Sequence, residues 1–361
     1  MRALEAQLGE HGKREVKLRE KTLDKSRPEP TQVLVQVTHA VVHRLGDGEK
    51  RLAGQGAGKV VAQGTAVTRC GSGDMVVFFT NDLLNHEACS QQILLDESQV
   101  AVKPHTLETC HATVAIEPGV LTYTAVHYKM RIQPGETVLI TNPYSFLGQL
   151  ATQLVAHHGA IPVLLLAPNE EHGDRFAPTA QLADLEMQCQ HVTPLPFLDE
   201  NTTPAKNVLA WREWCSKLSD QLLTCTSGLG FDHILDCGYP WIDSTASLNI
   251  ELWHNLLCET LGMHASLTID CTRTGGELPS SKFQVSRLAE RGATMSYLNF
   301  SSWTMSPIKR DQLLHIFEDL LIKLDQNILS LHPLWQEISL NDAPSLLNGL
   351  HQNDCPVIIR L

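Results

Sequence analysis

From about Val120 onward, short apolar runs alternate with segments that have the periodicity of amphipathic helices. Helices are expected between the runs, including 208–225 and 252–260. The strand candidates are Thr137–Ile140, Ile161–Leu166, His191–Phe197, His233–Cys237 and Ala265–Asp270. A regular β-α-β alternation of this kind predicts a Rossmann-type, doubly wound parallel sheet.

The first third of the chain has a different pattern, in which apolar and polar residues alternate over short stretches between turns. Strands are expected at 31–42, 58–67, 73–80 and 90–104, a spacing typical of a small β-barrel domain. A helix over 309–324 and a strand over 355–361 follow the α/β region. The sequence therefore predicts a small β-barrel-like domain of residues 1–119, to which 302–361 return, and a Rossmann-type domain of residues 120–301.

The composition argues against nucleic-acid binding, cysteine-based metal or redox motifs, and membrane insertion. A formal net charge of −12 disfavours a direct nucleic-acid reader, because such affinity needs many Lys and Arg contacts. The 10 cysteines include no Cys-x-x-Cys pair, so neither a zinc ribbon nor a redox dithiol is expected. No apolar run reaches the ~20 residues of a membrane span, and no signal peptide is seen. We expect a cytoplasmic protein with reduced thiols.

The expected nucleotide turn is degenerate. In a dinucleotide-binding unit, glycines between the first strand and helix let the backbone approach a pyrophosphate at the helix N-terminus. Here the turn reads Asn-Pro-Tyr-Ser-Phe-Leu-Gly over 142–148, with a glycine only at its end. Side chains obstruct such an approach, and Pro143 removes one N–H donor. The candidate, degenerate cofactor-binding residues are Asn142, Ser145, Phe146, Leu147, Gly148 and Asn169.

The sequence gives little support for a ribose-binding residue, a metal site or a serine hydrolase. The second strand ends in "LLLAPNEEH", which offers no Asp for a ribose 2′-hydroxyl and no Arg or Lys for a 2′-phosphate. Glu170 and Glu171 have the pattern of first-turn helix residues. Adjacent His157 and His158 point to different helix faces, so no metal site is expected. No G-x-S-x-G elbow of a serine hydrolase is present, and no catalytic residue can be assigned.

Six motifs occur in the order found in one enzyme family. The segment "AGKVVAQGTAV" at 57–67 matches A-G-x-V-x-x-x-G-x-x-V, and "GDMV" at 73–76 matches a G-D-x-V turn. The segment "KPHTLETCHA" matches K-P-x-x-L-x-x-x-x-A. Three more segments are "GVLTYTAVHYKMRIQPGETVLI", "GFDHILDCG" and "LAERGATMSYLNF". Together they resemble the medium-chain dehydrogenase/reductase family, in its zinc-free quinone oxidoreductase branch, over nearly the whole chain.

This resemblance implies a GroES-like fold for the β domain of residues 1–119, NADP or NAD as cofactor, no zinc, and a homodimer. It places Leu121 where members of the family have a threonine beside the nicotinamide, and Tyr123 where they have a tyrosine. Gln55 lies near the position at which an acidic residue is expected. The substrate loop that contains His39 and His43 lacks the family's Asn-x-x-Asp pattern. The strand through which such proteins often dimerise supplies the candidate interface residues Gly292, Thr294, Ser296, Leu298 and Phe300.

Two functions are compatible with the sequence, and we favour the second. One is an NAD(P)H-dependent, zinc-independent quinone or enone oxidoreductase, which needs little beyond bound cofactor and an oriented acceptor. The other is a catalytically inactive protein that needs no cofactor. This function is favoured because four parts of the expected cofactor and substrate site depart from the family pattern together: the nucleotide turn, the end of the second strand that would bind the ribose, the residues beside the nicotinamide, and the substrate loop. The resemblance then implies a homodimeric subunit of a FERRY-like endosomal Rab-effector complex linked to mRNA transport. Its partner would be a long helical protein, and RNA would be bound elsewhere in the complex.

Tryptophans bear on the second function. Trp211 and Trp214 share one face of the helix expected over 208–225, and Trp303 lies further along the chain. Such residues could contact a partner, although tryptophans three residues apart on a helix usually face the chain's own core.

Overall fold

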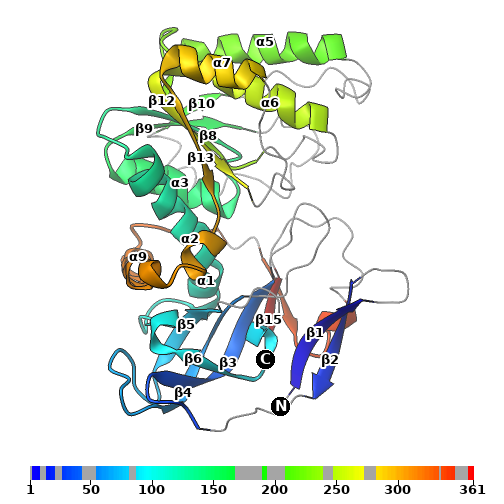
Figure 1. The fold of residues 1–361 in the computed structure, drawn as a ribbon, viewed down its shortest axis with the longest axis vertical. Helices are drawn as coiled ribbons and strands as arrows, with labels where there is room; N and C mark the ends of the chain where they lie inside the picture. Colours follow the sequence, from blue (N-terminus) through cyan, green and yellow to red (C-terminus); the bar gives the residue numbers. More distant parts are fainter. Residues whose placement is uncertain are drawn as a thin grey trace. The chain divides into compact units, whose positions relative to one another are not determined.

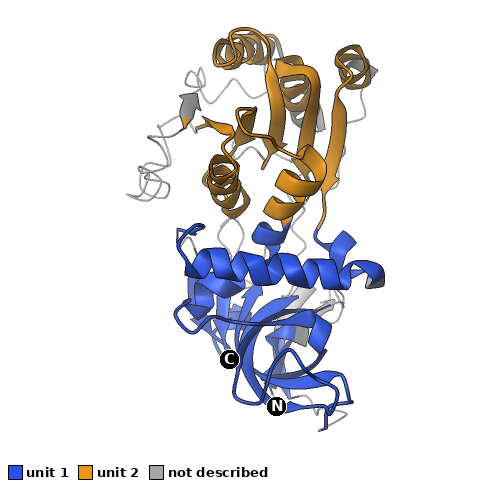
Figure 2. Cartoon of the chain, turned by 90° about the vertical axis from the view of Figure 1, so that its left-hand side faces the viewer, with its two compact units in different colours: residues 1–120, 300–361 blue, residues 121–299 orange. Residues whose placement is uncertain are grey.

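The computed structural model describes residues 2–8, 14–20, 27–42, 54–80, 87–166, 189–192, 208–238, 247–271, 282–332, 335–345 and 357–361. The chain divides into two compact units, shown in separate colours in Figure 2. Unit 1 consists of residues 1–120 and 300–361, and unit 2 of residues 121–299. Each unit is described by itself.

Unit 1 contains a seven-stranded sheet in the order β14-β15-β3-β4-β5-β7, with β6 paired to β3, and a separate β1–β2 hairpin. The strands are β1 Arg2–Leu8, β2 Arg14–Glu20, β3 Gln32–Val42, β4 Gln55–Gln63, β5 Met75–Phe79, β6 Gln92–Asp96, β7 Val100–Val102, β14 Gln336–Ser339 and β15 Val357–Arg360. Most pairings are antiparallel, and the C-terminal β15 pairs with β3. This is the mixed sheet expected of a β domain to which the C-terminus returns.

The helices of unit 1 are short, apart from one near the C-terminus. They are η1 Glu87–Cys89, η2 Glu97–Gln99, α1 Thr109–Val114, α8 Ser301–Thr304, η4 Pro307–Lys309 and α9 Arg310–Asp325, and α2 Ile116–Tyr123 begins in this unit. Alternation of side chains along β3 places Val33, Val35 and Val37 in the core of the sheet domain. Close packing also requires Gly119, because a Cβ there would lie 2.2 Å from a methyl carbon of Leu320 on α9.

Unit 2 is a doubly wound α/β domain whose six strands are all parallel, in the order β10-β9-β8-β11-β12-β13. Its strands are β8 Thr137–Thr141, β9 Ile161–Leu165, β10 Gln190–Val192, β11 Phe231–Asp236, β12 Leu261–Asp270 and β13 Thr294–Leu298. Its helices are η3 Thr124–Met130 (a π-helical segment), α3 Phe146–His157, α5 Val208–Thr224, α6 Ser247–Thr260 and α7 Lys282–Arg291. The predicted fold class is confirmed.

Helices cover both faces of this sheet. Figure 1 shows α5, α6 and α7 grouped on one face and α3 on the other. Leu139, Ile234 and Leu267 are register partners on β8, β11 and β12, and all three enter the core beneath α5 and α6. Apolar runs buried on both faces are the usual composition of parallel strands, which explains why the sequence pattern identified them.

The tryptophans of α5 belong to this core. Trp211 and Trp214 stack with ring centroids 4.8 Å apart and are both buried. Trp303 in unit 1 is buried as well. Of the two alternatives for these residues, the structure shows the packing in the chain's own core, because the spacing of three residues on α5 directs both indoles inward.

Several boundaries differ from those expected. Strand β4 begins at Gln55 and ends at Gln63, whereas the sequence suggested 58–67, because a turn starts at Gly64, whose N–H donates to the Gln32 carbonyl. The predicted linker 196–207 lies outside the described residues. Within those residues, no helix combines the length and apolar character that a bilayer crossing requires.

Candidate functional site

The carboxyl ends of β8, β11 and β12 form the edge of unit 2 at which a doubly wound sheet ordinarily binds its ligand. Two features are present there. One is the turn between β8 and α3, and the other is a buried cluster around Asp236 at the end of β11.

The turn after β8 satisfies its own polar groups. Ser145 is the N-cap of α3: its Oγ accepts a hydrogen bond from the Gly148 N–H at 3.0 Å and donates to the Asn142 carbonyl at 3.0 Å. The Ser145 N–H donates to the same carbonyl, at 3.1 Å. The Gln149 amide donates to the Tyr144 carbonyl at 2.8 Å. The N–H groups of Ser145 and Gly148 at the start of the helix are thus engaged within the turn.

Tight packing explains the one glycine that remains in the turn. A Cβ on Gly148 would lie 2.4 Å from the Asn142 carbonyl oxygen and 2.8 Å from the Pro143 Cα. Asn142 itself has φ of 46°, a left-handed conformation that Asn tolerates better than most residues. Gly148 therefore serves contact between helix and turn, a role that does not require a nucleotide.

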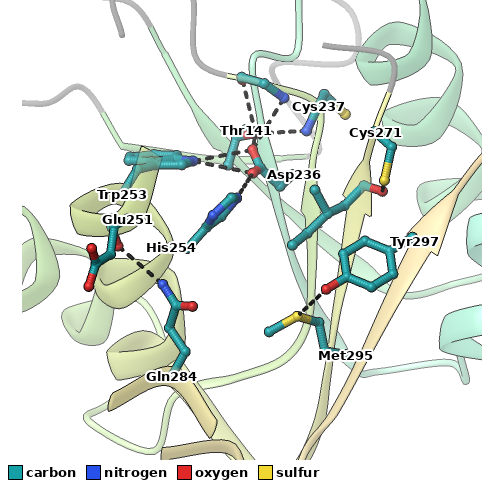
Figure 3. Close-up of polar contacts among 12 residues, drawn as sticks. Thr141, Asp236, Cys237, Glu251, Trp253, His254, Cys271, Gln284, Met295 and Tyr297 are labelled. Carbon is teal, nitrogen blue, oxygen red and sulfur yellow. Dashed lines mark hydrogen bonds and ion pairs between the residues drawn. The ribbon is translucent and has the colours of Figure 1, made fainter. Parts of the chain in front are cut away.

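The second feature is a network centred on the Asp236 carboxylate, which is 1% exposed (Figure 3). The Thr141 hydroxyl donates to Oδ1 at 2.8 Å, and the Gly238 N–H donates to the same atom at 3.2 Å. The Trp253 indole N–H lies 3.3 Å from both carboxylate oxygens. On α6, His254 Nε2 makes an ion-pair contact of 3.3 Å with Oδ2, although its geometry falls short of a hydrogen bond.

This environment keeps Asp236 ionised. Burial acts to raise the pKa of a carboxyl group, but contact with His254 and hydrogen bonds from Thr141 and Trp253 outweigh it, so the pKa of Asp236 is lowered. The network ties the ends of β8 and β11 to helix α6. A buried carboxylate with this many donors needs no external cation or ligand.

Other residues expected near a cofactor also contact their own unit. Tyr123 is buried and its ring lies 5.3 Å from that of His127, while Leu121 is buried too. In unit 1, the Gln55 amide donates to Glu117 Oε2 at 3.0 Å. His39 lies within β3 rather than on a loop, and burial together with the nearby Arg360 lowers its pKa. His43 and Asn169 lie outside the described residues.

The candidate interface residues have unequal environments. Thr294 is exposed on the edge strand β13, and Ser296 is half-buried, with its hydroxyl 3.0 Å from that of Thr268. Leu298 is fully buried. Phe300 belongs to unit 1, where its ring makes an edge contact with Phe79. Gly292 has φ of 61° and lies in the short connection between α7 and β13.

Sequence reasoning missed Thr141, Asp236, Trp253 and His254. Asp236 and Thr141 each end an apolar strand, and a polar residue at that place is a usable signal for the carboxyl edge of a parallel sheet. His254 gave no signal, because a histidine inside a helix is ordinarily a surface residue.

The cofactor implied by the fold can be tested against these residues. A pyrophosphate needs free backbone N–H groups at a turn that permits close approach. Here Pro143 has no N–H, and those of Ser145 and Gly148 are bonded within the turn. These three positions of the turn therefore offer no free N–H to that group. Among the residues that the structure describes, no set of three or more His, Cys, Asp or Glu side chains is placed to hold a metal ion.

No model of a known protein family matches the chain. The sequence is 26% identical over 269 residues to quinone oxidoreductase-like protein 1 of Mus musculus, covering 72% of this chain and 68% of that protein. The fold is similar to that of Escherichia coli quinone oxidoreductase in complex with NADPH, with a TM-score of 0.67, 15% identity and full coverage of both chains. A Pseudomonas syringae quinone oxidoreductase gives a TM-score of 0.64 at 16% identity, covering 99% of this chain and 100% of the other.

The two-unit architecture is therefore the fold of these quinone oxidoreductases, and the sequence is similar to a quinone oxidoreductase-like protein, in agreement with the family that the six motifs resemble.

Proposed function

We propose that this quinone oxidoreductase-like protein does not catalyse hydride transfer and serves as a homodimeric structural subunit of a multiprotein complex. The observation that carries the proposal is the turn at 142–148, in which Ser145 caps the Gly148 N–H and Pro143 has no N–H to offer. The buried Asp236 network supports it, because the polar groups at the end of β11 are bonded to the chain itself.

A homodimer is supported by the position of β13. This strand forms one border of the six-stranded sheet and has no neighbour on its outer side among the described strands. Exposed strand edges carry unpaired N–H and C=O groups that pair readily with another chain. A second copy in antiparallel orientation would extend the sheet across a two-fold axis.

The wider assembly rests on the sequence resemblance. A FERRY-like Rab-effector complex at early endosomes, with a long helical partner, is the role proposed for such a dimer in the cytoplasm. Direct RNA binding by this subunit is not proposed, since its net charge of −12 opposes contact with phosphates.

The test of inactivity is thermal unfolding with and without millimolar NADPH, NADH, NADP or NAD. A ligand that binds only the folded state stabilises it by RT ln(1 + [L]/Kd), about 2.7 kcal/mol at 100 Kd. We expect no shift in Tm with any of the four. A clear shift with one nucleotide, together with turnover of a quinone, would instead support the NAD(P)H-dependent oxidoreductase.

The dimer is tested by light scattering of the full chain after size-exclusion chromatography. We expect a mass of twice 40.0 kDa. Thr294→Asp with Ser296→Asp should reduce the mass to that of a monomer, because the two-fold axis would bring like charges together. A monomeric wild-type protein would contradict the proposal.

A further inference from the structure

Three side chains from separate strands form a hydrogen-bonded relay near the amino ends of β8, β11 and β12, away from the carboxyl edge. Ser266 Oγ lies 2.7 Å from His233 Nδ1, and His233 Nε2 lies 2.9 Å from Glu136 Oε2. His233 and Ser266 are register partners on β11 and β12, so their side chains project from the same face of the sheet. Glu136 immediately precedes β8.

The hydrogen-bond directions in this relay depend on the tautomer of His233. Glu136 Oε2 also accepts from the Gln133 N–H. In the tautomer that carries its proton on Nε2, His233 donates to the Glu136 carboxylate, and Nδ1 accepts from the Ser266 hydroxyl. A serine, a base and a carboxylate that orients the base are the arrangement that activates a hydroxyl nucleophile.

The relay carboxylate is not shared with neighbouring charges. Asp232, the adjacent acid on β11, instead accepts from the Thr137 N–H at 2.8 Å and the Thr137 hydroxyl at 2.9 Å. The relay also extends from the surface inward: the Glu136 side chain is 33% exposed, whereas His233 and Ser266 are 8% and 7% exposed as residues.

The backbone just before Ser266 is irregular. Between the pairs Phe231–Leu261 and His233–Ser266, β11 advances two residues while β12 advances five, so the strand bulges outward. Within the bulge, His264 has φ of 60°, a left-handed conformation that costs energy for a residue with a Cβ. Bulges and strained residues of this kind concentrate where a side chain is directed toward a reaction.

We propose that Ser266 is an activated nucleophile that accepts acyl groups from small activated esters, with His233 as general base and Glu136 as the residue that orients it. Ser266 Oγ forms a bond to the ester carbonyl carbon while its proton passes to His233 Nδ1. The ester C–O bond then breaks, and the leaving alcohol takes that proton. Water, deprotonated by the same histidine, releases the acyl group as a carboxylic acid and restores the serine.

The burial of Ser266 restricts the class of substrate. A residue that is 7% exposed admits a small acyl group more readily than a bulky one. Acetyl esters with good leaving groups, such as aryl acetates, are therefore the substrates expected. This activity is independent of nucleotide binding, because none of the three residues belongs to the turn at 142–148.

The experiment is covalent labelling of the full-length protein with a small alkyl fluorophosphonate, followed by intact mass measurement and peptide mapping. Release of p-nitrophenol from p-nitrophenyl acetate is followed in parallel. The variants are Ser266→Ala, His233→Gln and Glu136→Gln. Ser219→Ala is the matched control, since Ser219 in α5 is a serine of unit 2 with the same 7% exposure and no place in the relay. Circular dichroism verifies that each variant is folded.

We expect one label on Ser266, its loss in Ser266→Ala, and labelling slower by about 100-fold or more in His233→Gln, the size of effect usual for a general base. Ser219→Ala should label like the wild type. If Ser266→Ala does not fold, the labelling rate of folded His233→Gln decides the matter. No label on Ser266, or an unchanged rate in His233→Gln, would overturn the proposal.

Discussion

The two ends of the parallel sheet in unit 2 have different polar chemistry. At the carboxyl end, Asp236 receives three kinds of hydrogen-bond donor, and Ser145 closes the turn before α3. At the amino end, Glu136, His233 and Ser266 form a linear relay that begins at a part-exposed carboxylate. At the end that normally binds the ligand of this fold, Asp236 and Ser145 are hydrogen-bonded within the chain, whereas the other end has a serine bonded to a base.

This difference indicates that a fold can retain its architecture while the chemistry at its usual site changes. The carboxyl end of a doubly wound sheet is suited to ligands because helix N-termini leave donors there. When a cap such as Ser145 and a carboxylate such as Asp236 take up local donors, the same residues contribute to stability instead. Substitutions at each end should therefore have different consequences.

The largest expected effect is that of Asp236→Ala. It leaves the Trp253 N–H without its buried acceptor and removes the contact with His254, and removing one partner of a buried charged contact costs about 3–5 kcal/mol. Chemical denaturation measures the free energy of unfolding. Asp232→Ala is the control: this exposed acid on the same strand should cost about 1 kcal/mol. Equal losses in the two variants would show that the network does not stabilise the carboxyl end.

Gly148→Ala should have the next largest effect, a loss of about 1–3 kcal/mol, because the new Cβ would overlap the Asn142 carbonyl and force the turn to move. Gly71→Ala is a suitable control. The nearest atom to its Cβ would be 3.7 Å away, an ordinary contact, so its stability should change little. If Gly148→Ala is equally neutral, contact between helix and turn is not the reason for the glycine.

The pH dependence of stability should also distinguish the two ends. The folded-state pKa of Asp236 lies below the 3.8 of an unperturbed Asp, so the unfolded state binds more protons in this range. The stability that this group contributes is present above pH 4 and is lost as the pH falls through 3.8 toward the folded-state value. The free energy of unfolding, measured between pH 6 and pH 3, should fall less steeply in Asp236→Asn. Parallel curves would contradict the lowered pKa.

Ser145→Ala should have the smallest effect, a loss of about 1 kcal/mol, since it removes one helix N-cap. Thermal unfolding detects such a change. Ser145→Asp, which keeps a side-chain acceptor near the positive end of α3, should recover most of the stability. If Ser145→Ala has no effect, water replaces the cap and the turn is more accessible than its hydrogen bonds indicate.

Much of the fold could be predicted from the sequence. Parallel strands such as β8 and β9 are recognisable because burial on both faces requires continuous apolar runs. The degenerate turn was recognised too, because each missing glycine has a specific geometric meaning. The direction of the tryptophans on α5 was left open, since periodicity shows which residues share a face and not what covers that face.

The polar clusters were beyond prediction. Thr141 and Asp236 lie 95 residues apart in the sequence, as do the partners Glu136 and His233 at a separation of 97. Contacts between neighbouring parallel strands depend on register, and β12 shifts its register by a bulge just before Ser266. No local pattern encodes such a shift, so the relay could be found only in the folded chain.

The most direct test of the proposed inactivity is calorimetric titration of NADPH into the wild-type protein and into a variant with Asn142→Gly, Pro143→Ala and Tyr144→Gly. The variant restores a backbone donor and removes side chains at the turn, and glycine accepts the positive φ of residue 142. We expect no binding heat from the wild type at millimolar NADPH, and any binding gained by the variant measures the contribution of residues 142–144. Saturable binding of NADPH by the wild-type protein would contradict the proposal that its nucleotide turn is closed.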